Sequence, residues 1–382
     1  MAKIMQIEFN QTALISLLKD HFLLNLSRIK CLSLFILALI ETKSVNLSEL
    51  KNFFTSKALP DSRNKRLKRF LSQIKFAQDF LAIFLLKIMA IDDSKKLILI
   101  LDRTNWKFGL EDCNILYLAI AHKGIAIPLF WTPLKDQKRG NSSPENRIKL
   151  VQQFINCFGK ERIECIMGDR EFIGNVWINW LKEKKLPFVM RIKEKGQNIS
   201  CARGGMVKAE RLFDDLKIGE SKSLGLRRIS ESNTYKAQVT GLKTQNNETL
   251  ILIHCPSIED PCMAYKERWQ IERFFKSIKL IGFNLEETHI KNQEYLNTLL
   301  CVVSIAFCFN YKFGDVYIEA EKPKPKKHGY LPKSTTHYGH ECLIEIIRKT
   351  FFIATEVFHK IFNSLENSLF AKVFTFNLKI VR

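Results

Sequence analysis

The spacing of apolar residues changes near residue 95, and the change predicts two kinds of structure. Up to about residue 90, apolar side chains recur three and four residues apart, the spacing of amphipathic helices. From about residue 95, short apolar runs alternate with longer amphipathic segments, a pattern typical of an α/β fold. The sequence therefore predicts a helical amino-terminal region followed by an α/β domain.

Amphipathic segments in the amino-terminal region predict a small helical bundle. They cover residues 13–26, 32–42, 46–54, 63–73 and 76–89. Asn46 begins the third segment and Glu49 follows three residues later, which is the pattern of a capped helix start. We therefore expect an all-helical domain up to about residue 92.

The segments after residue 95 predict a sheet covered by helices. Strands are expected at residues 97–101, 114–121, 125–131, 163–167 and 188–192, and helices at residues 144–158 and 176–184. His122-Lys123-Gly124 joins the second and third strands as a hairpin turn. A three-strand meander followed by helix, strand, helix and strand is the order of a ribonuclease-H-like domain. The expected fold class is thus α/β, with a mixed sheet flanked by helices.

Two aspartates directly follow apolar strands. Asp102 follows the run at residues 97–101, and Asp169 follows the strand expected at residues 163–167 and Gly168. The carboxyl ends of strands are where an open α/β sheet exposes catalytic groups. A single aspartate in this place most often caps a helix or begins a turn. Two of them, joined by a glutamate from a later helix, match the carboxylates of a two-metal phosphoryl-transfer site, because Mg²⁺ prefers hard oxygen ligands.

A polar stripe is expected on a helix near residue 270. At about 100° per residue, the stripe is roughly 60° wide and contains Tyr265, Arg268, Glu272 and Lys279. The adjoining apolar face is expected to pack on a core and contains Met263, Ile271, Phe274, Phe275 and Ile278. A carboxylate flanked by an aromatic hydroxyl and two cations suits a metal held against a phosphate. The alternative is a salt-bridged helix, because Arg268, Glu272 and Lys276 are spaced four residues apart.

With the two aspartates and the stripe together, the chain resembles the insertion-sequence transposases of the IS-four group, which carry the DDE catalytic signature. Asp102 stands in Leu-Asp-Arg-Thr-Asn-Trp and Asp169 in Gly-Asp-Arg-Glu-Phe. The stripe matches the Y-x2-R-x3-E-x6-K signature of the group at all four positions. The resemblance covers about residues 95–315.

The resemblance implies a metal-dependent enzyme that acts on double-stranded DNA. Asp102, Asp169 and Glu272 would hold two Mg²⁺ ions, for which Mn²⁺ substitutes. The enzyme would cleave DNA at the terminal inverted repeats of a transposon and join the freed 3′-hydroxyl to target DNA. Phosphates near the cleavage site would be held by Tyr265, Arg268 and Lys279. A homodimer on paired ends, with contacts from Phe-rich carboxyl-terminal helices, and a place at the bacterial nucleoid are also implied.

The expected organisation divides the chain into parts with different tasks. In chain order they are a helical DNA-binding domain at residues 1–92, a first catalytic part at 93–194, a β-rich insertion at 195–257, a second catalytic part at 258–316, and a basic linker with a helical region at 317–382. Residues 249–254 predict a strand within the insertion. The resemblance gives this insertion a role in gripping the transposon end. The final helical pattern covers residues 341–365.

Composition indicates a polyanionic partner. The chain has 382 residues, with 60 Lys and Arg against 39 Asp and Glu, and a formal net charge of +21. A surplus of this size points to nucleic acid or to an anionic membrane. The apolar runs at residues 31–40 and 299–309 are shorter than the ~20 residues that cross a bilayer, so no membrane partner is expected. The same charge predicts a mainly monomeric free chain, because it opposes self-association until DNA neutralises it.

A basic cluster in the fourth expected helix is a second candidate DNA contact. Its cations are Arg63, Lys65, Arg66, Lys68 and Arg69, and Lys57 precedes them. On a small helical bundle, such a helix can lie along DNA. A solvated basic face explains the same residues equally well. The charge of the whole chain favours DNA.

Cysteine and tryptophan positions suggest packing roles. The chain has 10 cysteines, and because no Cys-x-x-Cys pair occurs, we expect neither a disulfide framework nor a zinc site, and a reducing cytoplasm. The cysteines inside apolar segments are Cys31, Cys165, Cys301 and Cys308. The tryptophans are expected in the core rather than at the site, and they are Trp106, Trp131, Trp177, Trp180 and Trp269.

Two other functions stay open at this stage. A ribonuclease-H-like nuclease or resolvase would share the metal chemistry, but it would not join ends and would not need the polar stripe or the insertion. A catalytically inactive, transposase-derived regulator would only bind DNA, and the three intact carboxylates weigh against it. Cleavage with joining, cleavage alone and binding alone would distinguish the three functions.

Overall fold

The computed structural model describes residues 11–54, 59–108, 111–134, 142–194, 196–230, 235–279, 282–290, 292–327 and 329–347. The chain forms two compact units, one made of Met1–Asp93 with Lys276–Arg382 and the other of Ser94–Phe275. The five parts expected from the sequence divide the chain more finely and remain a proposal. The expected second catalytic part, residues 258–316, is shared between the two units at residue 275.

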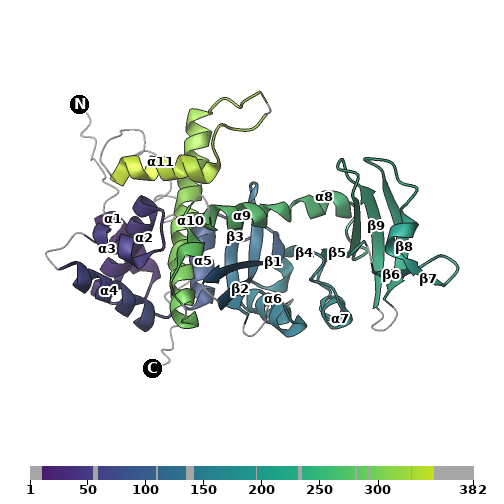
Figure 1. Cartoon of the computed structure of the whole chain (residues 1–382), viewed down its shortest axis with the longest axis horizontal. Helices are drawn as coiled ribbons and strands as arrows, with labels where there is room; N and C mark the ends of the chain where they lie inside the picture. The colour runs from purple at the N-terminus through teal and green to yellow at the C-terminus, as the bar shows by residue number, and fades with distance from the viewer. Residues whose placement is uncertain are drawn as a thin grey trace. The chain divides into compact units, whose positions relative to one another are not determined.

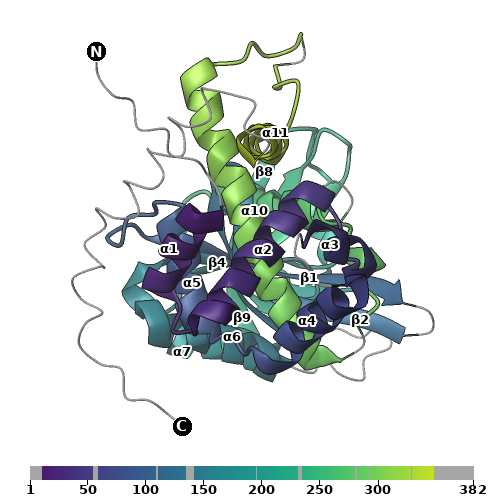
Figure 2. The ribbon, with the colours of Figure 1, turned by 90° about the vertical axis from the view of Figure 1, so that its left-hand side faces the viewer.

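The first unit contains helices and no strand among its described residues. Its elements are α1 (Gln11–His21), α2 (Leu26–Thr42), α3 (Leu47–Phe53), α4 (Pro60–Gln73), α5 (Gln78–Ile88), the 3₁₀ turn η3 (Leu285–Glu287), α10 (Gln293–Glu321) and α11 (Thr335–Ile347). The long α10 packs against α2, α4, α5 and α11, and Figures 1 and 2 show it running alongside the amino-terminal helices. Segments far apart in the sequence therefore build one apolar core.

The helices predicted in the amino-terminal region are confirmed, with shifted ends. Asn46 caps α3 as predicted, and its Oδ1 accepts the Ser48 N–H at 2.9 Å. The prediction placed the end of the first helix at residue 26, whereas α1 ends at His21 and α2 begins at Leu26. The reason is a second cap that the pattern of apolar residues does not show, because Asn25 Oδ1 accepts the Arg28 N–H at 3.0 Å.

Helix α10 extends well beyond the apolar run at residues 299–309, because it continues through polar residues to Glu321. By length and composition it could cross a membrane, as could α2 and α3 if their 107° bend were one broken span. However, 89% of the apolar window of α10 is buried inside its unit, and the polar Ser304 and Asn310 are buried with it. Such burial is typical of a core helix.

Helices α10 and α11 cross closely at two glycines. A Cβ on Gly339 would lie 1.6 Å from the Asn310 carbonyl oxygen, and one on Gly314 would lie 1.8 Å from the Thr335 carbonyl oxygen. Any other residue would push the helices apart. The helix predicted at residues 341–365 corresponds to α11 up to Ile347, and its remainder lies outside the described residues.

The described strands of the second unit form one mixed sheet. They are β1 (Leu97–Phe108), β2 (Glu111–His122), β3 (Ile125–Pro133), β4 (Ile163–Gly168), β5 (Phe188–Arg191), β6 (Asn198–Ser200), β7 (Met206–Lys208), β8 (Ser221–Ile229), β9 (Tyr235–Lys243) and β10 (Thr249–His254). Their order is β3-β2-β1-β4-β5-β10-β9-β8-β6-β7. Only the β1–β4 and β4–β5 pairings are parallel among the described strands, so the predicted mixed α/β class is confirmed.

Helices accompany this sheet along the chain. They are α6 (Pro144–Phe158), α7 (Asn175–Glu183), α8 (Pro261–Lys266) and the start of α9 (Trp269–Lys279), with 3₁₀ turns η1 (Lys160–Arg162) and η2 (Ala209–Leu212). The predicted hairpin between β2 and β3 is confirmed. Lys123 and Gly124 both have positive φ, 47° and 86°, which is the backbone of a type I′ turn.

The β-rich insertion continues the same sheet. Strands β6 to β10 all lie within residues 195–257, and β10 pairs with β5 through Leu252 and Arg191. Figure 1 shows β6, β8 and β9 side by side beyond β4 and β5. The insertion is therefore joined to the strands that carry the two aspartates by a continuous hydrogen-bonded ladder.

Two local predictions were wrong, and both concern candidate site residues. Asp102 does not end its strand, because β1 continues to Phe108 in an antiparallel ladder with β2. The stripe around residue 270 does not lie on one regular helix. Between α8 and α9 the backbone tightens, and the Arg268 N–H bonds the Tyr265 carbonyl three residues back at 3.1 Å.

The apolar face predicted beside the stripe is only partly correct. Ile271, Phe274 and Ile278 are buried, whereas Met263 is 60% exposed, because it lies before the break between α8 and α9. The tryptophans were predicted to lie in the core, and Trp106, Trp131 and Trp177 are buried as predicted. Trp180 is half-buried, and the prediction is wrong for Trp269. Trp269 is 54% exposed because it stands at the start of α9. The cysteines expected in apolar segments are all buried.

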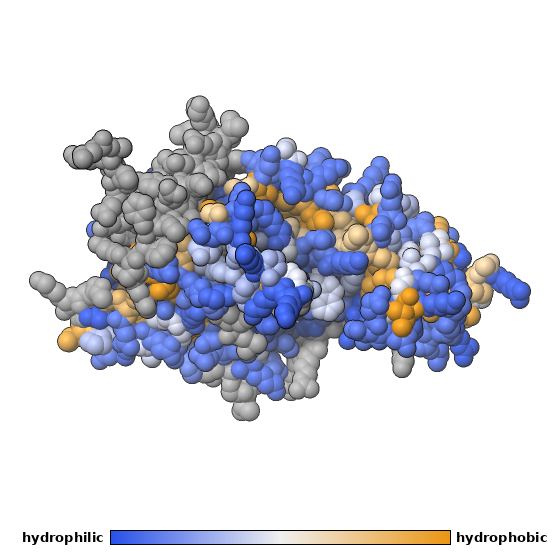
Figure 3. All heavy atoms as spheres, turned by 90° about the horizontal axis from the view of Figure 1, so that it is seen from above, coloured by the Kyte–Doolittle hydropathy of each residue, from blue (hydrophilic) through white to orange (hydrophobic). Residues whose placement is uncertain are grey.

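The coloured part of the surface in Figure 3 is mainly hydrophilic, with smaller hydrophobic areas between the polar side chains. Scattered exposed apolar residues such as Leu226 and Ile218 are ordinary on a protein surface.

Candidate active site

Three neighbouring strands place Asp102, Asp169 and Arg191 in one row. In the parallel ladders of β1 with β4 and of β4 with β5, these residues directly follow the last paired positions. Neighbouring strands lie about 5 Å apart, so side chains in such a row are within reach of one another. Arg191 Nη1 lies 4.0 Å from Asp169 Oδ1. Although Asp102 is inside its strand, β4 and β5 end beside it, so its largely buried carboxylate still reaches a cavity.

Asp102 is held on both carboxylate oxygens. Oδ1 accepts the N–H of Arg103 at 2.8 Å, and Oδ2 accepts Nη1 of Arg268 at 3.2 Å. Burial raises the pKa of Asp102 to about 7, although Arg268 and the Arg103 N–H oppose that shift. A carboxyl group in this state gains strongly from a nearby cation.

Arg268 bridges two of the predicted carboxylates from the turn between α8 and α9. Its Nη1 contacts Asp102, and its Nη2 donates to Glu272 Oε1 at 2.6 Å. The side chain is only 5% exposed. Burial alone would lower the pKa of Arg268, but Tyr265, Asp102 and the other acidic neighbours raise it overall. Arg268 therefore stays charged, and its buried Nε has no hydrogen-bond partner among the described residues.

Tyr265 connects the same turn to the second aspartate. Its hydroxyl donates to Asp169 Oδ1 at 3.4 Å, and its side chain is buried. Burial raises the pKa of Tyr265, so it stays a neutral hydrogen-bond donor. The Arg268 guanidinium lies 5.6 Å from the Tyr265 ring centre and 5.2 Å from that of the exposed Trp269.

The structure gives Lys279 a different environment from the other signature residues. It lies in the last turn of α9, within the helical unit, where its Nζ pairs with Glu286 Oε1 at 3.0 Å. The contacts of Tyr265, Arg268 and Glu272 link the signature with Asp102 and Asp169. Lys279 has its ion pair elsewhere, because the helix carries it into the other unit.

A cavity of about 260 Å³ opens at the two aspartates. It is lined by Asp102, Asp169, Arg170, Glu171 and Lys193. Two cations thus stand beside carboxylates. This combination can bind a phosphate group and a cation together.

The carboxylates fit a divalent cation in part. Among the described residues, no group of three or more His, Cys, Asp or Glu is arranged to hold a metal ion. Arg268 bonds both Asp102 and Glu272 and stands between them. Asp102 and Asp169 offer hard oxygen donors at the cavity, as Mg²⁺ or Mn²⁺ requires. Glu272 could join them only by leaving Arg268.

Sequence reasoning missed Arg191 and Lys193 at this site. The sequence predicts the fifth strand to end at residue 192, whereas β5 ends at Arg191. With the correct end, the argument that selected the aspartates at strand ends would also have selected Arg191. Lys193 follows two residues later, and alternate residues of an extended segment share a face. Arg170 and Glu171 are adjacent to Asp169, and the sequence allows them either to orient Asp169 or to form a surface ion pair. Glu171 pairs with Arg103, and both side chains are only 17% exposed, so this ion pair is not a surface pair.

The basic cluster of the helical unit is divided by the structure. A hollow of about 340 Å³ is lined by Arg66 and Arg69 of α4 and by Arg28 of α2. Arg63, Lys65 and Lys68 do not line it, and Lys57 lies outside the described residues. Arg28 was missed because it belongs to another helix, far from the cluster in the sequence. The amino-terminal end of α2, with Asn25 and Ser27, completes the hollow.

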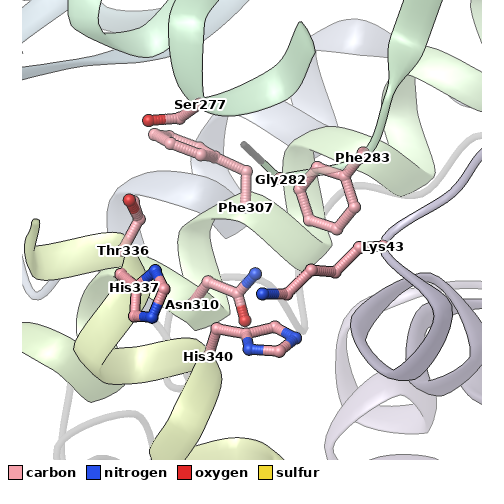
Figure 4. A pocket seen from close by; sticks show the side chains of 9 residues that line it. All are labelled: Lys43, Ser277, Gly282, Phe283, Phe307, Asn310, Thr336, His337 and His340. Atoms are coloured by element: carbon pink, nitrogen blue, oxygen red, sulfur yellow. The ribbon is translucent and has the colours of Figure 1, made fainter. Parts of the chain in front are cut away.

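A second cavity in the helical unit is too small for a substrate. Figure 4 shows Asn310, Lys43 and His340 among the side chains that line it. Its volume is about 20 Å³, the space of a single water molecule. Burial lowers the pKa of His340 to about 4, and its Nε2 bonds the Ile40 carbonyl oxygen at 2.9 Å. This cavity belongs to the packing of the bundle.

Comparisons with known proteins identify the family of this chain. No curated protein is similar enough to count as a match. Among solved structures, the chain is similar to a piggyBac transposase synaptic complex with hairpin DNA, at 12% identity and a TM-score of 0.42, over 91% of this chain and 77% of the other. The family model of the Transposase DDE domain matches residues 93–309, which contain Asp102, Asp169 and Glu272. The chain therefore belongs to the DDE transposase family.

Proposed function

We propose that this transposase catalyses cut-and-paste transposition. It cleaves double-stranded DNA at the terminal inverted repeats of its element, and the freed 3′-hydroxyl is then joined to target DNA. The observation that carries the proposal is the contact network of Asp102, Asp169 and Glu272 with Arg268 and Tyr265. Acidic oxygens bonded to a guanidinium fork, with two of the acids at a cavity, suit phosphodiester chemistry.

The carboxylates of Asp102, Asp169 and Glu272 are proposed to hold two divalent ions, Mg²⁺ or Mn²⁺. When bound, such ions lower the pKa of an attacking water and neutralise charge on the phosphate. Asp102 gains strongly from a cation, because burial raises its pKa to about 7. Glu272 is released for this role when Arg268 turns to a phosphate.

Arg268 and Tyr265 are proposed to hold the phosphate under attack, with Lys279 binding a phosphate further along the same strand. The fork of Arg268 can contact two oxygens of one phosphate, and its unused Nε is a further donor. Tyr265 donates a hydrogen bond without carrying charge. Arg170 and Lys193 add positive charge at the cavity, and Arg191 adds it beside Asp169.

The amino-terminal helices are proposed to form a second DNA contact. Of the basic cluster, Arg66 and Arg69 share a hollow with Arg28, and Arg28 and Arg69 are exposed. Neither forms an ion pair with a described residue, so both are available to phosphates. Arg63, Lys65 and Lys68 would make weaker, peripheral contacts on the same helix.

The finer family assignment is also a proposal. The Y-x2-R-x3-E-x6-K match supports membership of the IS-four group, and the strand order β3-β2-β1-β4-β5 supports a ribonuclease-H-like core. The domain division at residues 92, 194, 257 and 316, with a DNA-gripping insertion, belongs to the same proposal. So does action at the nucleoid in a bacterial cytoplasm.

A cleavage and joining assay on the full chain tests the function. The substrate is a labelled duplex that ends in the terminal inverted repeat flanking the gene, with Mg²⁺ and a target plasmid. We expect cleavage and joining by the wild type, and neither by Asp102→Asn, Asp169→Asn or Glu272→Gln. The exposed Glu164 of β4 offers a matched control, and Glu164→Gln should behave as wild type.

The same assay separates the alternatives. Cleavage without joined product would identify a nuclease or resolvase, and binding without cleavage would identify a regulator. Undiminished cleavage by Asp102→Asn would overturn the site assignment. Mass measurement with and without end DNA tests the dimer, for which we expect a monomer alone and two protomers on paired ends. A complex with one protomer that still cleaves and joins both ends would refute it.

A further inference from the structure

The turn that carries Asp169 is anchored from below. Phe172 is fully buried, and its N–H donates to the Asp169 carbonyl oxygen at 2.8 Å. Gly168 permits this packing, since a Cβ there would lie 2.8 Å from Phe172 Cβ and 3.0 Å from Met190 Sδ. The buried Phe172 side chain and this hydrogen bond therefore hold the backbone of the turn against the sheet.

Arg147 of α6 adds a second anchor and is an unusual core residue. Its side chain is only 3% exposed, and its guanidinium stacks 5.2 Å from the ring centre of Phe172. It donates to the carbonyl oxygens of Glu171 at 2.9 Å and Ile173 at 3.3 Å, and to Oγ of the buried Ser142 at 2.9 Å. Burial lowers the pKa of Arg147 to about 10, so it remains charged at neutral pH.

Packing alone does not account for a buried, charged arginine at position 147. A buried charge is costly unless hydrogen bonds replace its water, and an apolar side chain would fill the space without that cost. What the guanidinium supplies is several donors in fixed directions. Two of them hold consecutive parts of the turn that follows Asp169.

A third anchor joins this turn to the strand of the other aspartate. Both oxygens of Glu171 accept hydrogen bonds from the guanidinium of Arg103, through Nε and Nη2. Each of the two side chains is 17% exposed, so the pair is largely shielded from water. The backbone N–H of Arg103 in turn donates to Asp102 Oδ1 at 2.8 Å. The pair thus connects the residue after Asp102 with the turn after Asp169.

We propose that Arg147 and the Arg103–Glu171 pair form a positioning clamp that fixes the carboxylates of Asp102 and Asp169 relative to each other for divalent-ion binding. The clamp rests on the proposed function. Two neighbouring carboxylates repel each other, so without external anchors they would separate. The clamp residues act through the aspartates and are positioning residues. Removal of partners that orient metal ligands typically weakens metal affinity or activity about 10- to 100-fold.

Mn²⁺ binding to the full chain without DNA, measured by electron paramagnetic resonance, is the direct test. We expect Arg103→Gln and Glu171→Gln each to weaken Mn²⁺ binding about 10-fold. The double variant should be no weaker than either single variant, because both changes break one connection. End cleavage should fall in parallel, with DNA affinity close to wild type and with the circular-dichroism spectrum of the folded chain retained. Arg147→Lys, which keeps the charge and removes the fork, should act in the same direction.

Arg162→Gln is the matched control. Arg162 directly precedes β4, at the opposite end of the strand from Asp169, and its Nε donates to the Lys95 carbonyl oxygen at 3.4 Å. The Mn²⁺ affinity of this variant should equal that of the wild type. Because Arg147 is buried, Arg147→Lys could fail to fold. In that case the Mn²⁺ affinities of the Arg103 and Glu171 variants test the clamp.

Asp102→Asn separates failure of the clamp from failure of the proposed function. If Asp102→Asn loses Mn²⁺ binding while the double variant of the pair binds Mn²⁺ as tightly as wild type, the clamp is refuted and the metal site stands. If Asp102→Asn binds Mn²⁺ as wild type does, the proposed metal site is refuted, and the clamp with it. Additive losses of affinity in the double variant would also refute a shared connection.

Discussion

The two positively charged regions of this transposase differ in how far their arginines are buried. Arg268 is buried, bridges Asp102 and Glu272, and stacks near Tyr265. Arg69 in the helical unit is exposed, lines an open hollow and has no ion pair with a described residue. A buried charge is fixed by its partners and acts through position, whereas an exposed charge is screened by salt and acts by attracting a polyanion. Under the proposed function, the first region therefore serves catalysis and the second serves DNA affinity.

The largest expected effect is on the rate of cleavage. Arg268→Lys keeps the charge but cannot contact two phosphate oxygens, so we expect kcat for end cleavage to fall about 100-fold. Arg69→Lys should leave kcat unchanged, because a point charge serves an exposed phosphate contact equally well. Single-turnover cleavage at saturating protein measures both. Equal rates for Arg268→Lys and wild type would remove the distinction between the two regions.

The next effect is on stability. Arg268→Ala leaves Asp102 and Glu272 without their counter-charge, and we expect the free energy of unfolding to fall by about 3 kcal/mol. Arg69→Ala should change it by less than about 0.5 kcal/mol. All 5 tryptophans of the chain lie between residues 94 and 275, so their fluorescence in urea reports the unit of Arg268. Circular dichroism follows the helical unit, where Arg69 lies. A similar change for both variants would contradict the comparison.

A third prediction concerns pH and the buried carboxylate. The pKa of Asp102 is raised to about 7 in the fold, whereas an unfolded aspartate titrates near ~4. Between these values the folded chain holds a proton that the unfolded chain has released, so stability falls as pH rises from about 4 to about 7. Without divalent ions, Asp102→Asn should remove this part of the fall. Urea unfolding followed by tryptophan fluorescence at several pH values checks it, and identical profiles would refute it.

The smallest effect per residue is expected at the exposed hollow. Neutralising Arg28, Arg66 and Arg69 should flatten the plot of log affinity for DNA against log salt, by about one unit for each phosphate that the protein no longer neutralises. Lys65 and Lys68 lie on the same helix but not in the hollow, so Lys65→Gln with Lys68→Gln is the control and should change the slope less. Equal slopes for the wild type and all these variants would show that the basic cluster is a solvated face that does not contact DNA.

The sequence predicted which helices, strands and candidate site residues are present better than it predicted where the helices and strands end. Asp102 and Asp169 were selected by their place after apolar runs, and strands with those runs are present. The continuation of β1 was missed because its second half pairs with β2 alone and is more polar. The break before Trp269 was missed because a helical pattern of side chains does not reveal a turn tightened to three-residue hydrogen bonds.

Residues that act through tertiary contacts could not be predicted. Arg147 is 24 residues from Glu171 in the chain, and nothing in its own helix distinguishes it from a solvated arginine. Arg28 joins Arg66 and Arg69 only because α2 and α4 pack together. The exposure of Trp269 depends in the same way on the break before α9. The spacing of side chains reveals what neighbours in sequence share, and it does not reveal what the fold brings together.

The central claim is that Asp102, Asp169 and Glu272 share one divalent-ion site, and iron-directed cleavage tests it most directly. Fe²⁺ replaces Mg²⁺ in the full chain on end DNA, and ascorbate with peroxide then generates radicals that cut the backbone beside the bound ion. We expect cuts near residues 102, 169 and 272, all suppressed by excess Mg²⁺ and absent in Asp102→Asn. Cuts confined to other segments, or cuts near residue 272 that persist in Asp102→Asn, would contradict it.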